Sequence, residues 1–334
     1  MSFDPDAPGR LTDPILLDYL LHAKGPVSVD ALAKKWHLTH SQVTNELGRL
    51  RNAGCIIDMH PQYGPTLRSS GLGAWVEYLQ WACSLPKSNA PRRVEVYRQT
   101  TSTQDAARSL TERFGSEADG ALAIADEQTA GRGRLGRTWL APAATAVLFT
   151  RVCAWSQSEP APTVNRLMLA ASVAVARAIE SIAGKPTLEV KIKWPNDVLV
   201  QGLKIAGILI ETAGNAALIG IGINVSIEAS QMPAELRDHF TSLSRCARPA
   251  DRLLLLTETV RQMDRTLKEK NLNKLIKAWR RRCAQLTHRI SLRTNGKTVH
   301  GTVIDLDPYD GLIVRSDDGV MMHLHAATTT LLSN

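Results

Sequence analysis

Two short stretches carry side chains suited to binding phosphate. Residues 131–139, GRGRLGRTW, place three arginines and three glycines within nine positions. Arginine presents a planar cation that matches phosphate oxygens, and glycine leaves the backbone free to move. Residues 193–197, KWPND, end the apolar run LEVKIKW with a lysine that can aim a point charge into a cleft. Taken alone, each stretch has an ordinary alternative: an RGG-type nucleic-acid tail for the first and a strand end with a solvated lysine for the second.

Two further stretches could contact a ligand. Residues 101–105, TSTQD, stand at the start of a helix, so their hydroxyls could be N-caps or could bind an amide or ureido group. Gly220 and Gly222 alternate in the β-rich run ALIGIGINV. Such an alternation leaves room for a flat group against the backbone, and a close strand crossing is the alternative.

The elements around these stretches decide between the alternatives for the arginine loop. GRGRLGR directly follows the apolar run ALAIADEQ and leads into TWLAPAATAVLFT. A loop between two strands belongs to a folded domain, whereas RGG-type tails are embedded in disordered repeats. The sequence therefore predicts a flexible lid over a phosphorylated small molecule.

The central part of the chain predicts a mixed β-sheet with helices. The runs ALAIADEQ, AVLFTRVC, LEVKIKW, KIAGILIET and ALIGIGINV are β-rich, and helical periodicity appears over 164–184 and from 251 onward. Gln201–Gly202 separates two apolar runs and has the composition of a hairpin turn. This hairpin favours a mixed sheet over a purely parallel one.

The two ends of the chain predict smaller units. The first contains three short helical patterns, with a capping-box spacing at Thr39 and Gln42, followed by the hairpin-like CIIDMHPQYGPTL. This order is typical of a winged helix-turn-helix, and a helical packing module is the alternative. From about residue 288, Asn295–Gly296 and Asp318–Gly319 mark hairpin turns between short strands, which predicts a small β barrel.

Composition limits the classes of function. The 334 residues are 44% hydrophobic and carry a net charge of +8, yet the first 70 residues hold seven basic and seven acidic side chains. No run approaches the roughly 18 apolar residues of a membrane span, and the N-terminus lacks the pattern of a secretory signal. The five cysteines are scattered without a CxxC pair, which argues against disulfides and zinc. We expect a cytoplasmic protein with no membrane partner.

Together and in this order, the four stretches resemble the biotin protein ligases. GRGRLGR matches the family loop GRGRxGR, KWPND is identical to its lysine motif, and GILIE and GIGIN match its central strands. The resemblance covers about residues 94–334 and extends to the bifunctional, biotin-operon-repressor-like form when the first segment is included. It implies an α+β fold with four parts: a winged helix-turn-helix (1–68), a linker (69–93), a class II synthetase-like catalytic domain of the biotin/lipoate ligase type (94–280) and an SH3-like C-terminal domain (281–334).

The resemblance also implies a reaction and a set of site residues. Biotin and ATP, with Mg²⁺, would give biotinyl-5′-AMP, and the biotin would pass to a lysine of the biotin carboxyl carrier protein of acetyl-CoA carboxylase. Arg134 and Lys193 would be the catalytic residues and would also contact biotin. Gln104 stands where the family usually has asparagine. The further biotin-binding positions are Ser102, Thr103, Gln104, Gln128, Arg132, Gly133, Gly220 and Gly222, and the nucleotide-binding positions are Arg137, Trp139, Asn196 and Lys204. The sequence assigns no Mg²⁺ ligands.

Two alternatives stay open beside the ligase. One is a lipoate ligase, which shares the catalytic fold but lacks GRGRxGR. The other is a DNA-binding regulator that uses the ligase domain as a biotinyl-AMP sensor. Under either reading, the resemblance implies a homodimer when biotinyl-AMP is bound. The neutral first segment and Glu46 on the expected reading helix argue against strong DNA binding. The residues that would contact operator DNA are Lys34, Lys35, His40, Arg49 and Arg51.

Overall fold

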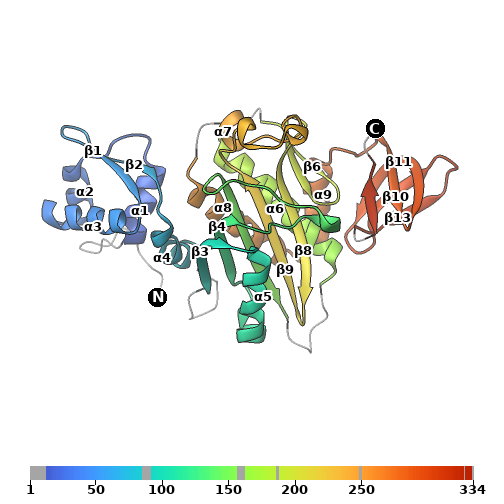
Figure 1. Cartoon of the computed structure of the whole chain (residues 1–334), viewed down its shortest axis with the longest axis horizontal. Helices are drawn as coiled ribbons and strands as arrows, with labels where there is room; N and C mark the ends of the chain where they lie inside the picture. Colours follow the sequence, from blue (N-terminus) through green and yellow to red (C-terminus); the bar gives the residue numbers. More distant parts are fainter. Residues whose placement is uncertain are drawn as a thin grey trace.

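The computed structural model describes residues 13–84, 92–155, 162–185, 188–247, 250–326 and 328–332. Along the chain it has a helical N-terminal segment, a central sheet with helices and a C-terminal sheet. These three parts lie one after another along the long axis of the molecule (Figure 1).

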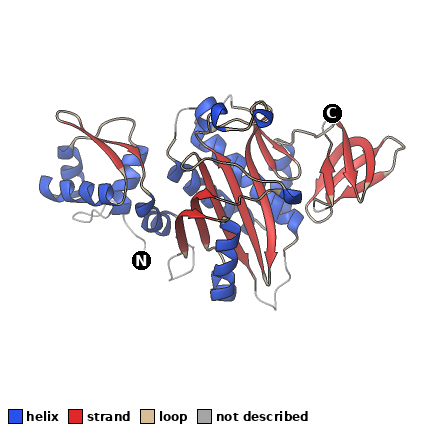
Figure 2. Ribbon diagram, viewed as in Figure 1, coloured by secondary structure: helices blue, strands red, loops and turns tan. Residues whose placement is uncertain are grey.

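The N-terminal segment has the predicted helices and hairpin. Ser28 Oγ accepts a hydrogen bond from Ala31 N, and Thr39 and Gln42 form the predicted capping box, so both helix starts are fixed by side chains. The elements are α1 (Asp13–His22), α2 (Val29–Trp36), α3 (His40–Asn52), β1 (Ile56–His60) and β2 (Gly64–Ser69). Their arrangement agrees with the winged helix-turn-helix prediction, with β1 and β2 as the wing (Figure 2).

The predicted linker begins with a packed helix, α4 (Leu72–Ala82). Just before it, the backbone N–H and the hydroxyl of Ser70 donate to the two carboxylate oxygens of Asp251, each at 2.7 Å. Asp251 is also the N-cap of α8 (Arg252–Lys268). The N-terminal segment is therefore hydrogen-bonded to the central part, while linker residues 85–91 lie outside the described residues.

The central part is built on a seven-stranded sheet in the order β3-β4-β5-β9-β8-β7-β6. β3 runs parallel to β4 and the other neighbours are antiparallel, which confirms the mixed sheet. Gln201 and Gly202, at φ 52° and 81°, make the predicted turn between β7 and β8. The strands are β3 (Val94–Thr100), β4 (Leu122–Gln128), β5 (Ala146–Ala154), β6 (Val190–Lys193), β7 (Asp197–Val200), β8 (Leu203–Ala213) and β9 (Ala216–Asn224).

The two faces of this sheet have different roles. Ile219, Ile221 and Ile223 of β9 pack in the large core with α6 (Val164–Ala183) and α8, and α9 (Leu272–Arg280) packs against α6. Leu218 instead packs with α5 (Thr103–Phe114). Because side chains alternate along a strand, Gly220 and Gly222 face the same side as Leu218, which is the α5 side. A short helix, α7 (Leu243–Cys246), completes the central part.

The C-terminal part is a five-stranded antiparallel sheet in the order β13-β12-β11-β10-β14. Asn295 and Gly296, at φ 47° and 77°, form the predicted turn between β10 and β11. The SH3-like barrel form stays a prediction. The strands are β10 (Arg289–Thr294), β11 (Lys297–Asp307), β12 (Gly311–Ser316), β13 (Met321–Leu324) and β14 (Thr329–Leu331).

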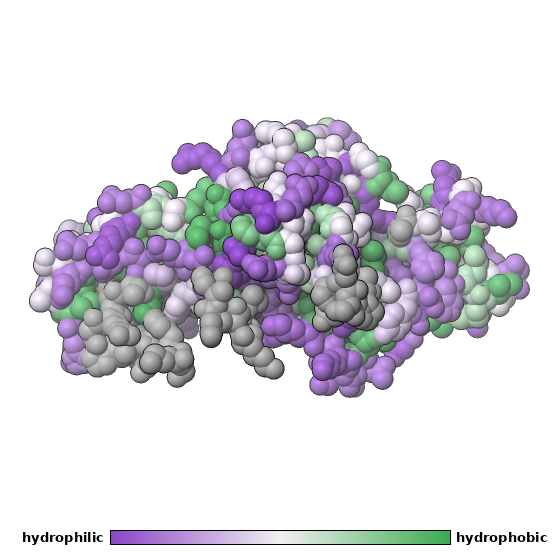
Figure 3. Space-filling model, turned by 90° about the horizontal axis from the view of Figure 1, so that it is seen from below, coloured by the Kyte–Doolittle hydropathy of each residue, from purple (hydrophilic) through white to green (hydrophobic). Residues whose placement is uncertain are grey.

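The surface and the cysteines agree with the composition. Hydrophilic residues cover most of the described surface in the view of Figure 3, and the hydrophobic areas there are small and scattered. Within the described ranges, no helix is long and apolar enough to cross a bilayer. All five cysteines are free.

Candidate functional site

A cavity of about 340 Å³ opens on the α5 side of the sheet. It brings together the four stretches that the sequence singled out, from the start of α5, the loop after β4, the end of β6 and the middle of β9. Every ligand-site residue predicted from the sequence lines it: Ser102, Thr103, Gln104, Gln128, Arg132, Gly133, Arg134, Arg137, Trp139, Lys193, Asn196, Lys204, Gly220 and Gly222.

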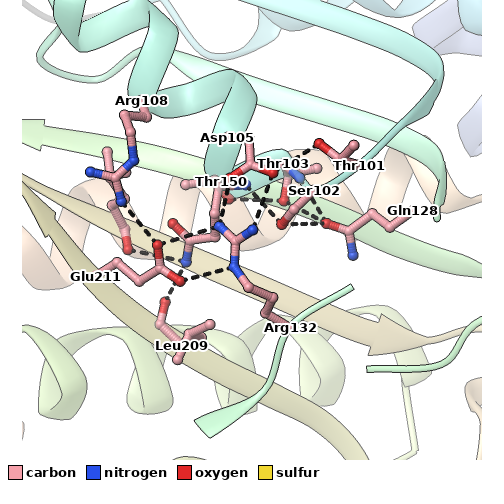
Figure 4. Close-up of polar contacts among 12 residues, drawn as sticks. Thr101, Ser102, Thr103, Asp105, Arg108, Gln128, Arg132, Thr150, Leu209 and Glu211 are labelled. Carbon is pink, nitrogen blue, oxygen red and sulfur yellow. Dashed lines mark hydrogen bonds and ion pairs between the residues drawn. The ribbon is translucent and has the colours of Figure 1, made fainter. Parts of the chain in front are cut away.

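One end of the cavity is polar and uncharged. Gln128 Oε1 accepts hydrogen bonds from Thr103 N at 2.8 Å, Thr103 Oγ1 at 3.1 Å and Ser102 Oγ at 3.3 Å (Figure 4). Thr150 Oγ1 of β5 donates to Thr103 Oγ1 at 2.9 Å. Ser102 is also the N-cap of α5, accepting from Gln104 N. The hydroxyl of Ser102 is thus both a helix cap and a member, with that of Thr103, of one network that holds Gln128.

Gln104 lies against the sheet at this end. Its Nε2 donates to Leu209 O at 3.0 Å and to Leu218 O at 3.4 Å, so the amide bridges β8 and β9. A Cβ at Gly220 would lie 2.5 Å from Gln104 Nε2. Gln104 Oε1 is buried and has no hydrogen-bond partner. The glycine therefore makes room for this side chain, which leaves an acceptor free.

Gly222 likewise leaves room for the side chain of Trp139. A Cβ at Gly222 would come within 2.5 Å of Trp139 Cε2, and one at Gly207 within 2.8 Å of Trp139 Cζ3. Gly207 and Gly222 are directly paired between β8 and β9, so together they form a flat backbone surface under the indole. The flat groups that the alternating glycines accommodate are the chain's own Gln104 and Trp139.

The arginine-rich loop, residues 131–139, is a short hairpin. Trp139 N donates to Gly131 O at 3.0 Å, Gly133 N donates to Arg137 O at 2.7 Å, and Arg132 bridges Thr138. Its tip has φ 57° at Leu135 and 73° at Gly136, and positive φ at both central residues is typical of a type I′ turn. The predicted motion of this loop as a lid stays a prediction.

Arg134 connects the hairpin with the C-terminal part. Its guanidinium donates to Asn196 Oδ1 at 3.4 Å, to Thr329 O at 3.1 Å and to Ala326 O. Burial lowers the pKa of Arg134 from its ordinary value. The lining of the cavity also includes Thr330 and Leu331 from β14, so the C-terminal sheet contributes to the site.

The lysine motif, residues 193–197, lines the end of the cavity at which Arg134 lies. Lys193 is exposed at the end of β6, and its register partner on β7 is Asp197. Lys204 Nζ lies 2.7 Å from Asp197 Oδ1 and 5.5 Å from the centroid of the Trp139 ring. With Arg134 and Arg137, these side chains make one end of the cavity cationic.

Arg132 lines the cavity, but its guanidinium is bound by carboxylates. It contacts Asp105 of α5 and Glu211 of β8 (Figure 4). The hydrogen bond from Arg132 is the main cause that lowers the pKa of Asp105, and the hydrogen bond to Asp105 chiefly raises that of Arg132. Neither carboxylate was assigned a role from sequence, although both lie within quoted motifs, TSTQD and GILIE.

The side chains predicted to contact DNA are partly engaged within the N-terminal segment. Arg49 lies 2.9 Å from Glu46 Oε1, His40 pairs with Asp30, and Arg51 donates to Ile57 O at 3.0 Å. Lys35 lies over the rings of Tyr19 and Trp36. Lys34 is the remaining residue of those predicted to contact DNA. The role of all five on DNA stays a prediction.

Comparisons with known proteins identify the family. Residues 96–228 match the model of the biotin/lipoate A/B protein ligase family. The chain is 33% identical over 231 residues to the bifunctional ligase/repressor BirA of Bacillus subtilis, covering 66% of this chain and 68% of that protein. It is 34% identical over 220 residues to the biotin–[acetyl-CoA-carboxylase] ligase of Mycobacterium tuberculosis, covering 65% of this chain and 80% of the relative.

Solved structures agree with this assignment. The biotin protein ligase of Aquifex aeolicus in complex with biotin and ATP aligns with a TM-score of 0.62 at 25% identity, over 72% of this chain and 99% of that one. With the sequence relatives, this similarity confirms the resemblance first inferred from the four motifs: the chain belongs to the biotin protein ligase family.

Proposed function

We propose that the chain uses ATP to convert biotin into biotinyl-5′-AMP, with release of pyrophosphate, in the cavity described above. It then passes the biotin to a lysine of the biotin carboxyl carrier protein of acetyl-CoA carboxylase. The observation that carries this proposal is one cavity with two chemically different ends. The uncharged end suits the ureido ring of biotin, and the cationic end suits a carboxylate and phosphates. Relatives named as biotin–[acetyl-CoA-carboxylase] ligases support the choice of carrier.

The uncharged end offers both donors and acceptors to a ureido group. Ser102, Thr103 and Gln128 are held in place by hydrogen bonds among themselves, so a ligand meets a preformed set. Gln104 Oε1 is a buried acceptor without a partner, which costs about 1–3 kcal/mol when left unsatisfied. A ureido N–H donor would relieve that cost, so we assign Gln104 to the ligand despite its extra methylene.

The cationic end would reduce the repulsion between the biotin carboxylate and the ATP phosphates during adenylation. A biotin carboxylate oxygen attacks the α-phosphorus of ATP, and the bond from that phosphorus to the pyrophosphate oxygen breaks. Two anions must approach each other, so fixed positive charge lowers the barrier. We assign Lys193 to the carboxylate and α-phosphate and Arg134 to the phosphate of the adenylate. Arg134 is now held by carbonyl and amide oxygens, which phosphate oxygens would replace.

The second step needs no nucleophile from the chain. The neutral amine of the carrier lysine attacks the acyl carbon of biotinyl-AMP, AMP leaves, and an amide bond forms. Trp139 on its glycine surface would pack against the adenine, with Asn196, Lys204 and Arg137 around it. Closure of the hairpin would keep water from the mixed anhydride.

The residues lining the cavity fit a Mg²⁺ ion that takes most of its ligands from ATP. Asp197 is the one carboxylate among these described lining residues, and elsewhere in the described ranges no cluster of metal-binding side chains occurs. Mg²⁺ is often held by one or two carboxylates together with substrate phosphates. When bound, it would neutralise phosphate charge during the first step.

An adenylation assay tests the proposal. Purified chain is incubated with [α-³²P]ATP and either biotin or lipoate, and labelled adenylate is separated by thin-layer chromatography. We expect adenylate with biotin and none above background with lipoate. Adenylate with lipoate alone would make the chain a lipoate ligase, and no adenylate with either acid would refute the proposal.

A second function, biotin-responsive binding to operator DNA, is favoured by the wing that follows α3 and by relatives named as ligase/repressors. The carboxylates on Arg49 and His40 weaken the basic surface, so we expect binding only from a homodimer stabilised by biotinyl-AMP. Gel shifts with the organism's own biotin-gene promoters, with and without biotinyl-AMP, test this. No shift in either condition would leave the N-terminal segment as a packing or interaction module.

A further inference from the structure

A cluster of four charged side chains lies beside the base of the arginine hairpin. Asp105 and Arg108 belong to α5, Arg132 to the hairpin, and Glu211 to β8 (Figure 4). The cluster pairs two cations with two carboxylates and joins three elements that are far apart in sequence. Neither the adenylation chemistry nor the binding of biotin and ATP proposed above uses its carboxylates.

Arg132 is the centre of the cluster. Its Nη1 and Nη2 donate to the two oxygens of Asp105 at 3.1 and 2.8 Å, and its Nε donates to Glu211 Oε1 at 3.1 Å. Nη2 also lies 3.4 Å from Glu211 Oε2. Four of its five N–H groups are directed at these carboxylates, because a guanidinium carries five donors. One N–H group is left, so an anion that binds Arg132 through two hydrogen bonds would have to displace a carboxylate.

The cluster holds the base of the hairpin, at Arg132, and makes no contact with its tip at Leu135 and Gly136. The backbone of Arg132 forms an antiparallel β-bridge with Thr138 across the hairpin, and Thr138 directly precedes Trp139. Asp105 directly follows Gln104, and Glu211 lies two residues beyond Leu209, which accepts from Gln104 Nε2. The same short segments of α5 and β8 therefore hold both the biotin end of the cavity and the base of the hairpin.

We propose that Asp105 and Glu211 are positioning residues, which hold Arg132 and thereby set the base of residues 131–139 in a binding-ready geometry before substrate arrives. This inference rests on the proposed function for its kinetic consequences. It assigns Arg132 to anchoring the loop, in contrast to the direct contact with biotin that the sequence predicts for it.

The two roles of Arg132 predict opposite effects of neutralising the carboxylates. If Asp105 and Glu211 anchor the loop, Asp105→Asn and Glu211→Gln weaken biotin binding, because the ligand must then order the hairpin. If Arg132 binds the substrate anion directly, the carboxylates compete with that anion, and the same changes strengthen biotin binding or leave it unaltered.

The first experiment measures biotin affinity by calorimetry and adenylation kinetics for Asp105→Asn, Glu211→Gln and a control, Arg113→Gln. Arg113 also lies on α5 and pairs with a carboxylate, Glu95 of β3, but it does not line the cavity. We expect each of the first two variants to raise the Kd and KM for biotin about tenfold, with kcat at saturation within twofold, since the pairs are partly exposed and their bonds correspondingly weakened. The control should match the unmodified chain. Unchanged or tighter biotin binding in Asp105→Asn would overturn the proposal.

A double-mutant cycle separates anchoring from a merely helical role, because Asp105 also lies in the first turn of α5, where a carboxylate favours the helix. In an Arg132→Gln background, Asp105→Asn should have no further effect on biotin Kd. An additional tenfold loss there would assign Asp105 to the helix and contradict the anchoring role.

Limited trypsin digestion without substrates gives a readout that does not depend on ligase activity. Arg134 and Arg137 supply cleavage sites in the hairpin. We expect both carboxylate variants to be cut there about tenfold faster than the Arg113→Gln control, because local opening exposes the backbone. Equal rates would overturn the proposal even if the chain adenylates biotin, and faster cutting in a chain without adenylation activity would refute only the proposed function.

Discussion

A methyl group added at Gly222 tests whether Trp139 on its glycine surface forms the nucleotide end of the cavity. In Gly222→Ala the new Cβ would lie 2.5 and 2.6 Å from indole carbons Cε2 and Cζ2. These contacts are closer than real Cβ atoms allow, so the indole must move off the sheet. Gly220→Ala is the matched change, because its Cβ meets Gln104 Nε2 at 2.5 Å instead.

The size of the effect follows from the cost of overpacking. Forcing an extra methyl into a packed site costs about 1–3 kcal/mol, and 1.4 kcal/mol is a factor of ten, which gives roughly a 5- to 150-fold loss of affinity. We expect Gly222→Ala to raise the KM for ATP by such a factor while the KM for biotin stays within threefold. Gly220→Ala should do the reverse, since it displaces the side chain at the biotin end.

Adenylation kinetics with each substrate varied in turn measure both constants. Gly48→Ala in α3 is the control for the substitution itself, because a Cβ there meets no atom within 4 Å. Thermal unfolding shows whether each variant is folded. A Gly222→Ala protein with an unchanged or lower KM for ATP would refute the role of Trp139 in binding the nucleotide.

Four further outcomes are expected. Lys193→Ala should lower the rate of biotinyl-AMP formation by about 10²–10³-fold with an unchanged unfolding temperature, as measured with [α-³²P]ATP, and a normal rate would show that Lys193 is not needed. Arg134→Gly should release biotinyl-AMP about tenfold faster, since a charge-assisted bond contributes about 1.5–3 kcal/mol, and a streptavidin blot of added albumin should then show label that the unmodified chain does not produce. Asp264→Asn should destabilise the fold by about 3–5 kcal/mol in urea, because it leaves the buried Arg92 and Arg151 without their shared carboxylate; a loss below 1 kcal/mol would contradict this. Burial is the main cause that raises the pKa of Glu46 from 4.5 to about 7. The folded chain therefore holds this proton more tightly than the unfolded chain, and its free energy of unfolding falls as the pH rises between these two values. Glu46→Gln should flatten this pH dependence of stability, as measured by denaturation curves at several pH values.

Local signals predicted local structure well. The capping box at Thr39 and Gln42 needs only neighbouring residues, and the turn at Gln201–Gly202 follows from the positive φ values that such dipeptides tolerate. The β-rich apolar runs indicated β4, β5, β6, β8 and β9 for the same reason, whereas β3 was not among the runs singled out. These features depend on contacts within a few residues, which a single sequence records directly.

Contacts between distant segments could not be predicted from spacing. Gly222 indicated a close approach, but the group that approaches, Trp139, comes from another element and is identified by the fold alone. The pairing of Arg132 with Asp105 and Glu211 likewise needs α5, the hairpin and β8 to meet. A cationic side chain in a glycine-rich loop reads as a phosphate ligand until its carboxylate partners are known.

The resemblance to a family supplied what local patterns could not. KWPND alone favours a solvated strand end, yet with GRGRLGR it predicted that Lys193 and Arg134 line the same cavity, and the structure confirms this placement. The contact of Arg134 with Thr329 and Ala326 was not predicted, because nothing near β14 in the sequence indicates that the C-terminal sheet reaches the site.

A crystal structure of the chain with a non-hydrolysable biotinyl-AMP analogue would test the central claim most directly, namely that one two-ended cavity holds the adenylate. The account predicts the ureido ring against Ser102, Thr103 and Gln128, the phosphate between Lys193 and Arg134, and the adenine beside Trp139. An analogue bound with its ureido ring at the cationic end, or outside this cavity, would contradict it.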